Sequence, residues 1–447
     1  MRKILFLSLL AFFNLAYSQL LPTDPTVYEI INSVSAERLE SDIKKLVSFG
    51  TRHTMSDTVS ETRGIGAARR WIKQEFEKIS SECGGCLEVF EQRSFVKAGP
   101  NTRITKDTWV VNVYAVKRGT QYPNRYVIMS GDIDSRVSDP LNYTDDSPGA
   151  NDNASGMAGA IESARVLSKY DFPSSVLLAG LSGEEQGLFG GRFLAQKAKN
   201  EAWEIAAILN NDMIGNIEGV DGVIDNRSFR IFSEPYSILS SEKELKRKRF
   251  YGGENDSPSR QVARYVYQTT KTYMPEMNPI LIYRLDRFGR GGHHTPFNNA
   301  GFAGVRIMEA HENYNRQHQD IRTEDGIEYG DVIEGVNFEY CRKMTAVNAA
   351  SLASMALAPP SPENVSIGGI VKPSAYLKWD KVEGAAGYKV YWRDTTAPTW
   401  QYSRLVSGEE TEFTVEGVVI DNFLFGVAAI GEAGHESVVS YPTSVVR

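Results

Sequence analysis

Along the first 358 positions of the chain, segments with apolar residues at helical spacing alternate with short apolar runs that are typical of strands. Apolar residues at helical spacing predict helices at 36–48, 64–79, 158–169, 192–199 and 340–357. Short apolar runs predict strands at 109–116, 126–129, 176–181, 205–209, 280–283 and 304–308. Strands that alternate with helices predict a three-layer α/β fold, in which a mixed but mostly parallel sheet is buried between helices.

The pattern changes at a proline-rich segment, Ala358-Pro359-Pro360-Ser361-Pro362. Beyond it no helical period remains, and alternating residues predict half-buried strands at 376–379, 387–392 and 423–429. We therefore expect an α/β domain at 19–358, a stiff linker at 359–362 and an all-β sandwich at 363–447.

The N-terminus has the pattern of a secretory signal peptide. Arg2 and Lys3 precede an apolar stretch at 4–16, and small residues at 16 and 18 predict cleavage before Gln19. Residues 1–18 are thus expected to be removed, leaving a secreted or periplasmic protein. No later segment is long and apolar enough to predict a membrane span.

Charge and cysteine content narrow the expectations further. The net charge of −7 is spread along the chain, which argues against a nucleic-acid partner. Cys83 and Cys86 are three residues apart and could form a redox pair, half of a zinc site or a small structural disulfide. We favour the disulfide because the expected compartment is oxidising. Cys341 lies in a predicted helix and is expected to be a buried free thiol.

Acidic residues follow the ends of three predicted strands. They are Asp132 and Asp134, then Glu184 and Glu185, then Asp212. Ligands of open α/β sheets bind beyond the carboxyl ends of the strands, so we expect these side chains to share one crevice. Asp152 joins them from a Pro-Gly loop that starts the next helix, and His318 from the loop after the last strand.

Several carboxylates in one crevice carry a large electrostatic cost. Asp132, Asp152, Glu185 and Asp212 would bring four negative charges together, and buried carboxylates are expensive to ionise. Two divalent cations would remove that cost, with Asp152 bridging ions about 3.5–4 Å apart. The alternative is that these residues are separate surface charges.

Three motifs carry a specific resemblance. Gly149-Ala150-Asn151-Asp152-Asn153-Ala154-Ser155-Gly156, Gly183-Glu184-Glu185-Gln186-Gly187 and Asn211-Asp212-Met213 resemble those of the co-catalytic zinc aminopeptidases of peptidase clan MH, which also contains glutaminyl cyclases. The resemblance extends from about residue 34 to about residue 359. It implies two divalent ions, zinc by family preference, with Asp152 as the bridging ligand and Glu184 as the general base. It also implies that Glu185 and His318 complete one metal site, and Asp212 with Asp132 the other.

The chain departs from the family pattern at position 132, where relatives carry histidine. Asp132 can still ligate zinc, but its added charge predicts a weaker site or one that prefers an oxygen-seeking ion such as Mn²⁺. Asp134, which usually orients that histidine from outside the set of direct ligands, loses its expected partner.

The oxyanion donor of the reaction is also open. Gln317 stands where some relatives carry a catalytic tyrosine, and either its amide or Tyr314 could donate to the oxyanion. The resemblance places His294 near the substrate carbonyl, with a structural hydrogen bond as the alternative. His293 is expected to contact the metal ligands without binding the metal itself, and His311 is an alternative metal ligand.

These residues predict a secreted metal-dependent exopeptidase, most simply an aminopeptidase acting on peptides or proteins. The alternatives are a single-zinc enzyme resembling glutaminyl cyclase and a non-catalytic peptide-binding protein on the same fold. Residues 363–447 resemble a fibronectin type III domain, with Trp379 on an early strand and a Tyr-x-Val-Tyr strand at 388–391. We expect this module to be a spacer or to bind a surface or polymer ligand.

Overall fold

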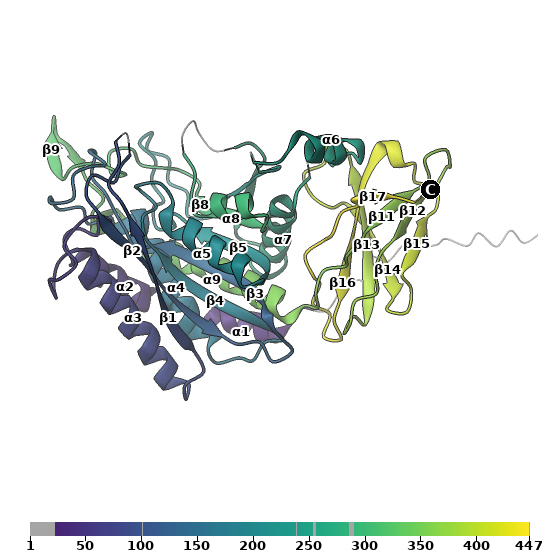
Figure 1. The fold of residues 1–447 in the computed structure, drawn as a ribbon, viewed down its shortest axis with the longest axis horizontal. Helices are drawn as coiled ribbons and strands as arrows, with labels where there is room; N and C mark the ends of the chain where they lie inside the picture. Colours follow the sequence, from purple (N-terminus) through teal and green to yellow (C-terminus); the bar gives the residue numbers. More distant parts are fainter. Residues whose placement is uncertain (1–22, 101, 238, 254–255, 286–289, 447) are drawn as a thin grey trace, which may run out of the picture.

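The structure is a computed structural model that describes residues 23–446 except for residues 101, 238, 254–255 and 286–289 (Figure 1). The expected signal peptide, residues 1–18, lies outside the described residues. Within them, no helix combines the length and apolar character that crossing a membrane requires.

An eight-stranded mixed sheet forms the centre of the large N-terminal domain. Its spatial order is β1-β2-β4-β3-β5-β8-β6-β7. The strands are β1 (Glu88–Val96), β2 (Thr108–Lys117), β3 (Tyr122–Asp132), β4 (Ser174–Leu181), β5 (Glu204–Asn211), β6 (Ser228–Ser233), β7 (Asn278–Ile282) and β8 (Gly304–Glu309). The central strands β4, β3, β5 and β8 are parallel neighbours, so their carboxyl ends meet at one edge.

Helices cover both faces of this sheet (Figure 1). One face packs against α1 (Pro25–Ser33), α2 (Ala36–Val47), α3 (Gly64–Glu82), α4 (Gly156–Leu167), α7 (Pro258–Tyr273) and α9 (Phe338–Leu357). The other face packs against α5 (Phe189–Asn200) and α8 (His294–Ala300). The three-layer α/β prediction is confirmed.

Strand β3 shows why the sheet is buried on both sides. Val127 and Met129 belong to the core on the α4 and α9 face, whereas Tyr126 and Ile128 belong to the core on the α5 and α8 face. Side chains alternate along a strand, so two apolar faces need an unbroken apolar run. The run ends at Asp132, where the strand reaches the edge that carries the acidic residues.

The remaining residues form a separate β region with two facing sheets. One sheet has the order β15-β12-β11-β17 and the other β14-β13-β16. Its strands are β11 (Ser366–Gly368), β12 (Ala375–Lys378), β13 (Gly387–Asp394), β14 (Tyr402–Ser407), β15 (Glu412–Val415), β16 (Phe423–Ile430) and β17 (Ser444–Val445). Side chains from both sheets, among them Trp379 and Val390, fill one common core.

This β region packs against the large domain beside α7 (Figure 1). Asp256, just before α7, receives Nη1 of Arg264 at 2.5 Å and Nη2 of Arg393, on β13, at 2.7 Å. All three side chains are buried. A second contact joins Nε2 of His435 to Oδ2 of Asp24 at 2.7 Å. The module is therefore docked by buried charges as well as tethered by the linker.

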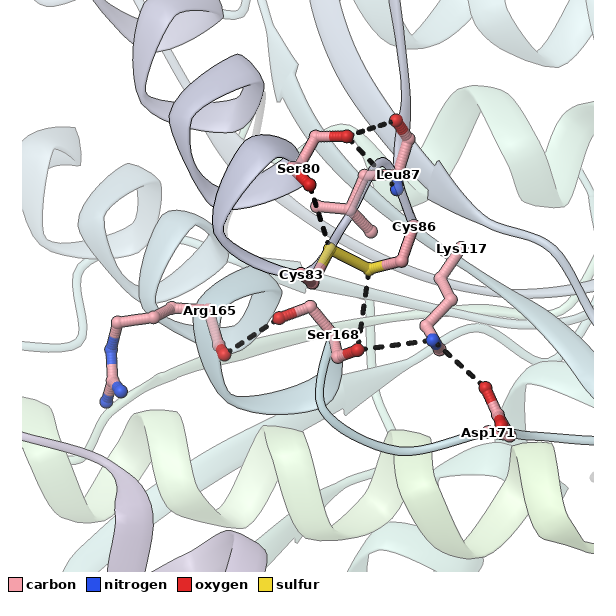
Figure 2. Close-up of a disulfide and its surroundings, with 8 residues drawn as sticks. All are labelled: Ser80, Cys83, Cys86, Leu87, Lys117, Arg165, Ser168 and Asp171. Carbon is pink, nitrogen blue, oxygen red and sulfur yellow. Dashed lines mark hydrogen bonds and ion pairs between the residues drawn. A yellow bond between two sulfur atoms is a disulfide. The ribbon is translucent and has the colours of Figure 1, made fainter.

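Cys83 and Cys86 form a disulfide at the C-terminal end of α3 (Figure 2). Sγ of Cys86 lies 3.4 Å from the carbonyl oxygen of Ser168, which also accepts a hydrogen bond from Nζ of Lys117 at 3.2 Å. The bridge thus lies against the end of α4, away from the acidic edge of the sheet. Cys341 is a buried free thiol in α9, as expected.

Candidate metal centre

Three of the predicted metal ligands meet beyond the carboxyl ends of the central strands. Nε2 of His318 lies 2.9 Å from Oδ2 of Asp152 and 2.9 Å from Oε1 of Glu185. One ligand atom of each residue lies within 4.8 Å of the other two. Two carboxylate oxygens and one imidazole nitrogen are ligands that suit Zn²⁺.

Separate segments deliver these three side chains. Asp152 lies in the short η1 turn (Ala150–Ser155) before α4, and Glu185 in the turn after β4. His318 lies in the loop between β8 and the β9 strand (Arg322–Glu324). Its φ of 55° falls in the left-handed region that residues other than glycine rarely occupy. The surrounding loop therefore holds this histidine in an uncommon backbone conformation.

Asp331 orients the Asp152 segment, a role that the sequence did not reveal. Its Oδ1 accepts the backbone N–H of Asn151 at 2.8 Å, and its Oδ2 accepts that of Asp152 at 2.6 Å. Nδ2 of Asn151 in turn donates to Oε2 of Glu309 at 2.9 Å. Burial and the charge of Asp152 raise the pKa of Asp331 to about 7, although the two backbone hydrogen bonds from Asn151 and Asp152 act to lower it.

Asp134 fixes the turn that carries the two glutamates. Its Oδ1 accepts the backbone N–H of Gly183 at 2.8 Å and of Glu184 at 3.2 Å, and its Oδ2 accepts that of Glu185 at 3.1 Å. The hydroxyl of Thr54 donates to the same carboxylate at 3.1 Å. Asp134 therefore supports the Glu184-Glu185 pair, and needs no histidine at position 132 for that task.

Arg136 joins two of the three ligands from behind. Its Nε lies 2.8 Å from Oε2 of Glu185, and its Nη2 lies 2.7 Å from Nδ1 of His318. These contacts hold the imidazole so that its Nε2 faces the carboxylates of Asp152 and Glu185. Burial alone would raise the pKa of Glu185, but the neighbouring His318 and Arg136 lower it to about 2. Glu185 is thereby kept ionised and ready to bind a cation.

Glu184 precedes Glu185 in the chain and lies beside the three-donor site. Burial, together with the charges of Glu185 and Asp132, raises the pKa of its carboxyl well above the usual value. A carboxylate with a raised proton affinity is suited to take a proton from water. Its position next to Glu185 in the chain is the one predicted for the general base.

Asp132 and Asp212 lie in the same acidic region but are held by protein donors. Oδ1 of Asp132 lies 2.6 Å from Nδ1 of His293, and its Oδ2 lies 2.7 Å from Nδ2 of Asn153. Oδ2 of Asp212 receives Nη1 of Arg306 at 3.0 Å. Within the described ranges, neither carboxylate belongs to a group of three donors close enough to share an ion.

The residues considered for the oxyanion have other surroundings. With its amide turned to suit its neighbours, Gln317 places its side-chain oxygen 2.7 Å from Nη2 of Arg290, as an acceptor. Tyr314 is 49% exposed. Nε2 of His294 lies 3.4 Å from Oε1 of Glu234, which fits the structural alternative for this buried histidine. His311 lies near Asp225, with 3.8 Å between Nε2 and Oδ2, and is not part of the three-donor group.

The chain is similar in sequence to known metallopeptidases. Residues 112–333 match the family model described as Peptidase family M28. A probable zinc metalloprotease of Pyrenophora tritici-repentis is 43% identical over 427 residues, covering 94% of this chain and 87% of that protein. A probable zinc metalloprotease of Leptosphaeria maculans is 42% identical over 419 residues, covering 93% of this chain and 96% of that protein.

Solved structures share the fold at low sequence identity. LapB from Legionella pneumophila has a TM-score of 0.54 and 17% identity, over 75% of this chain and 76% of that one. The LapA aminopeptidase of the same organism has a TM-score of 0.53 and 17% identity, over the same shares. An aminopeptidase from Aneurinibacillus sp. strain AM-1 has a TM-score of 0.50 and 13% identity, over 74% of this chain and 96% of that one. At these identities the likeness concerns the fold.

Proposed function

This chain belongs to peptidase family M28, and we propose that it is a secreted zinc-dependent aminopeptidase that removes residues from the N-termini of peptides or proteins. Relatives described as probable zinc metalloproteases support a zinc peptidase. The aminopeptidases among the solved structures of the same fold support the choice of an exopeptidase.

The observation that carries the proposal is the convergence of Asp152, Glu185 and His318 beside Glu184. The donor set and its spacing fit Zn²⁺, and all three residues are aligned by further contacts from Asp331 or Arg136. When bound there, zinc would supply the Lewis acidity that activates a water and polarises the scissile carbonyl.

Each protein group then has a defined task. Glu184 takes a proton from the attacking water and passes it to the amine that leaves when the peptide bond breaks. Asp134 keeps Glu184 in place through the backbone of the turn. Arg136 keeps Glu185 ionised, and Asp331 holds the backbone that presents Asp152.

The acidic surroundings support a preference for a free N-terminus. Burial, together with the charges of Glu185, Asp132 and Asp212, raises the pKa of Glu184, which marks an acidic region next to the three-donor site. Such a region favours the ammonium group of an unblocked peptide over a neutral acetylated one. We therefore expect the enzyme to bind substrates by their charged end.

A substrate pair tests this proposal. The zinc-loaded protein is incubated with a peptide and with its N-acetylated form, and products are followed by mass spectrometry. We expect stepwise loss of single N-terminal residues from the free peptide alone. Equal cleavage of both forms would indicate an endopeptidase, and cleavage of neither would favour a peptide-binding protein.

One observation favours a second candidate, glutaminyl cyclase activity. Among the residues that the structure describes, one group of three donors lies close enough to hold an ion. The resemblance to glutaminyl cyclases implies a single zinc. A peptide with N-terminal glutamine separates the two activities. Loss of 17 Da (roughly the mass of ammonia) with no shorter peptide would indicate cyclisation, and release of free glutamine would indicate hydrolysis.

The proposal also includes export and a role for the C-terminal module. We propose that residues 1–18 are cleaved, which N-terminal sequencing of the protein from culture medium would test by a first residue at Gln19. We propose that residues 363–447 form a fibronectin type III-like module. Its buried contacts with Asp256 support a bracing role in addition to any binding of a surface or polymer.

A further inference from the structure

On the basis of the zinc site proposed above, we propose that this chain binds one zinc ion tightly and that a buried arginine and neutral protein donors take the place of the second ion of its family. Arg306 contacts a carboxylate oxygen of Asp212, and His293 contacts one of Asp132. These are oxygens that the two residues would otherwise offer to a metal. The two-metal expectation from the sequence does not fit the contacts of these residues.

Arg306 is the first part of the replacement. It lies within β8 with no exposed surface, and its Nη1 lies 3.0 Å from Oδ2 of Asp212. The same nitrogen donates to the carbonyl oxygen of Gly291 at 2.7 Å, and the guanidinium lies 4.6 Å from the ring centre of Phe232. An arginine in a protein does not lose its proton, so a positive charge faces Asp212 throughout the ordinary pH range. A divalent cation at Asp212 would have to be accommodated beside that charge.

Asp132 is the second part. One of its oxygens is engaged by Nδ1 of the fully buried His293 and the other by Nδ2 of Asn153. Asn153 is fixed in turn, because Nδ2 also donates to the carbonyl oxygen of Asn211 at 2.7 Å and Oδ1 accepts the backbone N–H of Gly156 at 3.1 Å. Asp132 is thus oriented by protein donors on both sides.

The spacing of the donors agrees with these contacts. Among all residues that the structure describes, Asp152, Glu185 and His318 are the one group of three whose ligand atoms come within 4.8 Å of one another. Asp152 would have to serve both ions in a two-metal site. Here Asp152 belongs to a group with Glu185 and His318, and the described residues contain no such group that joins it to Asp132 and Asp212.

Zinc content of the full-length exported protein tests the inference directly. The protein is saturated with Zn²⁺, passed through a desalting column, and measured for zinc per chain by atomic spectroscopy. We expect one zinc per chain. Two retained ions would overturn the inference.

Two isosteric variants locate the ion. In Asp132→Asn we expect zinc content to stay at one, because this residue binds no tightly held metal. In the matched control Glu185→Gln we expect it to fall close to zero. A fall in Asp132→Asn from two ions to one would overturn the inference.

A double substitution tests whether the buried charge of Arg306 prevents a second ion from binding. Asp132→His with Arg306→Met restores the family's nitrogen donor and removes the buried charge, and we expect a second zinc to be retained. A folded double variant that still holds one zinc would overturn the role of Arg306. Circular dichroism checks its folding.

A cobalt titration of the unaltered protein gives the answer without any variant. We expect visible absorption to saturate at one equivalent of Co²⁺, and a second tight increase between one and two equivalents would contradict the inference. A peptide-cleavage assay on the same protein shows whether the ion count or the proposed function has failed. An aminopeptidase with two tight ions refutes only the inference, whereas a one-zinc protein that cleaves nothing refutes only the function.

Discussion

The carboxylate of Asp331 accepts the backbone N–H of Asp152, with 2.6 Å between Oδ2 and the nitrogen. This bond fixes the direction in which Asp152 presents its own carboxylate to His318. Groups that orient a metal ligand typically contribute 10–100-fold to metal affinity. We therefore predict that Asp331→Ala weakens zinc binding by about 10–100-fold, measured by competition with a chromophoric chelator. The exposed Asp325→Asn is the control, and an unchanged affinity in Asp331→Ala would contradict the role.

Arg136 helps to keep Glu185 ionised at low pH. The pKa of Glu185 is lowered to about 2, so its carboxylate stays ionised well below neutral pH. In Arg136→Gln that pKa rises, because one of the groups that lower it is removed. Protons then compete with zinc at higher pH. We predict that the pH at which half of the zinc is released shifts upward, measured by zinc retained after dialysis at a series of pH values.

The surface variant Arg322→Gln controls for the loss of positive charge, because Arg322 pairs with Glu324 on the exposed hairpin. Its release midpoint is expected to match the unaltered protein. A downward shift, or no shift, in Arg136→Gln would show that Arg136 does not protect Glu185.

Asp42 predicts a pH dependence of stability far from the metal centre. It is buried in α2 with Oδ2 3.4 Å from Nε of Arg38, and burial, reinforced by Glu75 and Glu162, raises its pKa to about 7. Between pH 4 and pH 7 the unfolded chain loses this proton while the folded chain keeps it. The stability that Asp42 contributes in its protonated form is therefore lost as the pH rises to about 7.

We predict that Asp42→Asn matches the unaltered protein near pH 4 but gains stability on the order of 2–4 kcal/mol at pH 8. Urea unfolding of both proteins across this range measures the difference. The exposed Glu61→Gln is the control and should track the unaltered protein at every pH. Parallel curves for Asp42→Asn and the unaltered protein would contradict the prediction.

Much of the fold follows from the apolar pattern, because its elements are long and strongly periodic. The predicted helix at 340–357 corresponds to α9, Phe338–Leu357, and the predicted strand at 176–181 to β4, Ser174–Leu181. The expectation that Glu185, at a strand end, meets Asp152 and His318 from neighbouring loops is also matched. The topology of parallel strands dictates that convergence before any side-chain contact is known.

The supporting residues were harder to find. Asp331 and Arg136 lie in loops, where no periodicity indicates which of many charged residues turns inward. Arg306 did carry an indication, because it interrupts the apolar strand 304–308 and a buried arginine requires an acidic partner. The sequence therefore predicted the three donors that the structure brings together, but not the buried arginine that we propose limits the number of ions.

The docking of the C-terminal module gives a further prediction. Arg393 and Arg264 share the buried carboxylate of Asp256, and removing one partner of a buried ionic group costs about 3–5 kcal/mol. Because Asp256 would keep Arg264, we predict a smaller loss of about 2–3 kcal/mol in the free energy of unfolding for Arg393→Met. Guanidinium unfolding provides the measurement.

Lys381→Met is the matched control within the same module, since Lys381 and Glu409 form an exposed pair. Exposed pairs contribute about 0–1 kcal/mol, so this variant should unfold almost as the unaltered protein does. Equal effects of the two substitutions would show that the contact with Asp256 does not stabilise the module.

The most direct test of the central claim is the turnover of zinc-loaded Glu184→Gln on an unblocked peptide. Glu184 is the group that we assign to proton transfer, whereas zinc is assigned to Asp152, Glu185 and His318. We predict an unchanged zinc content and a fall in kcat by about 10²–10⁴-fold. Turnover within a few-fold of the unaltered protein, with zinc still bound, would contradict the account.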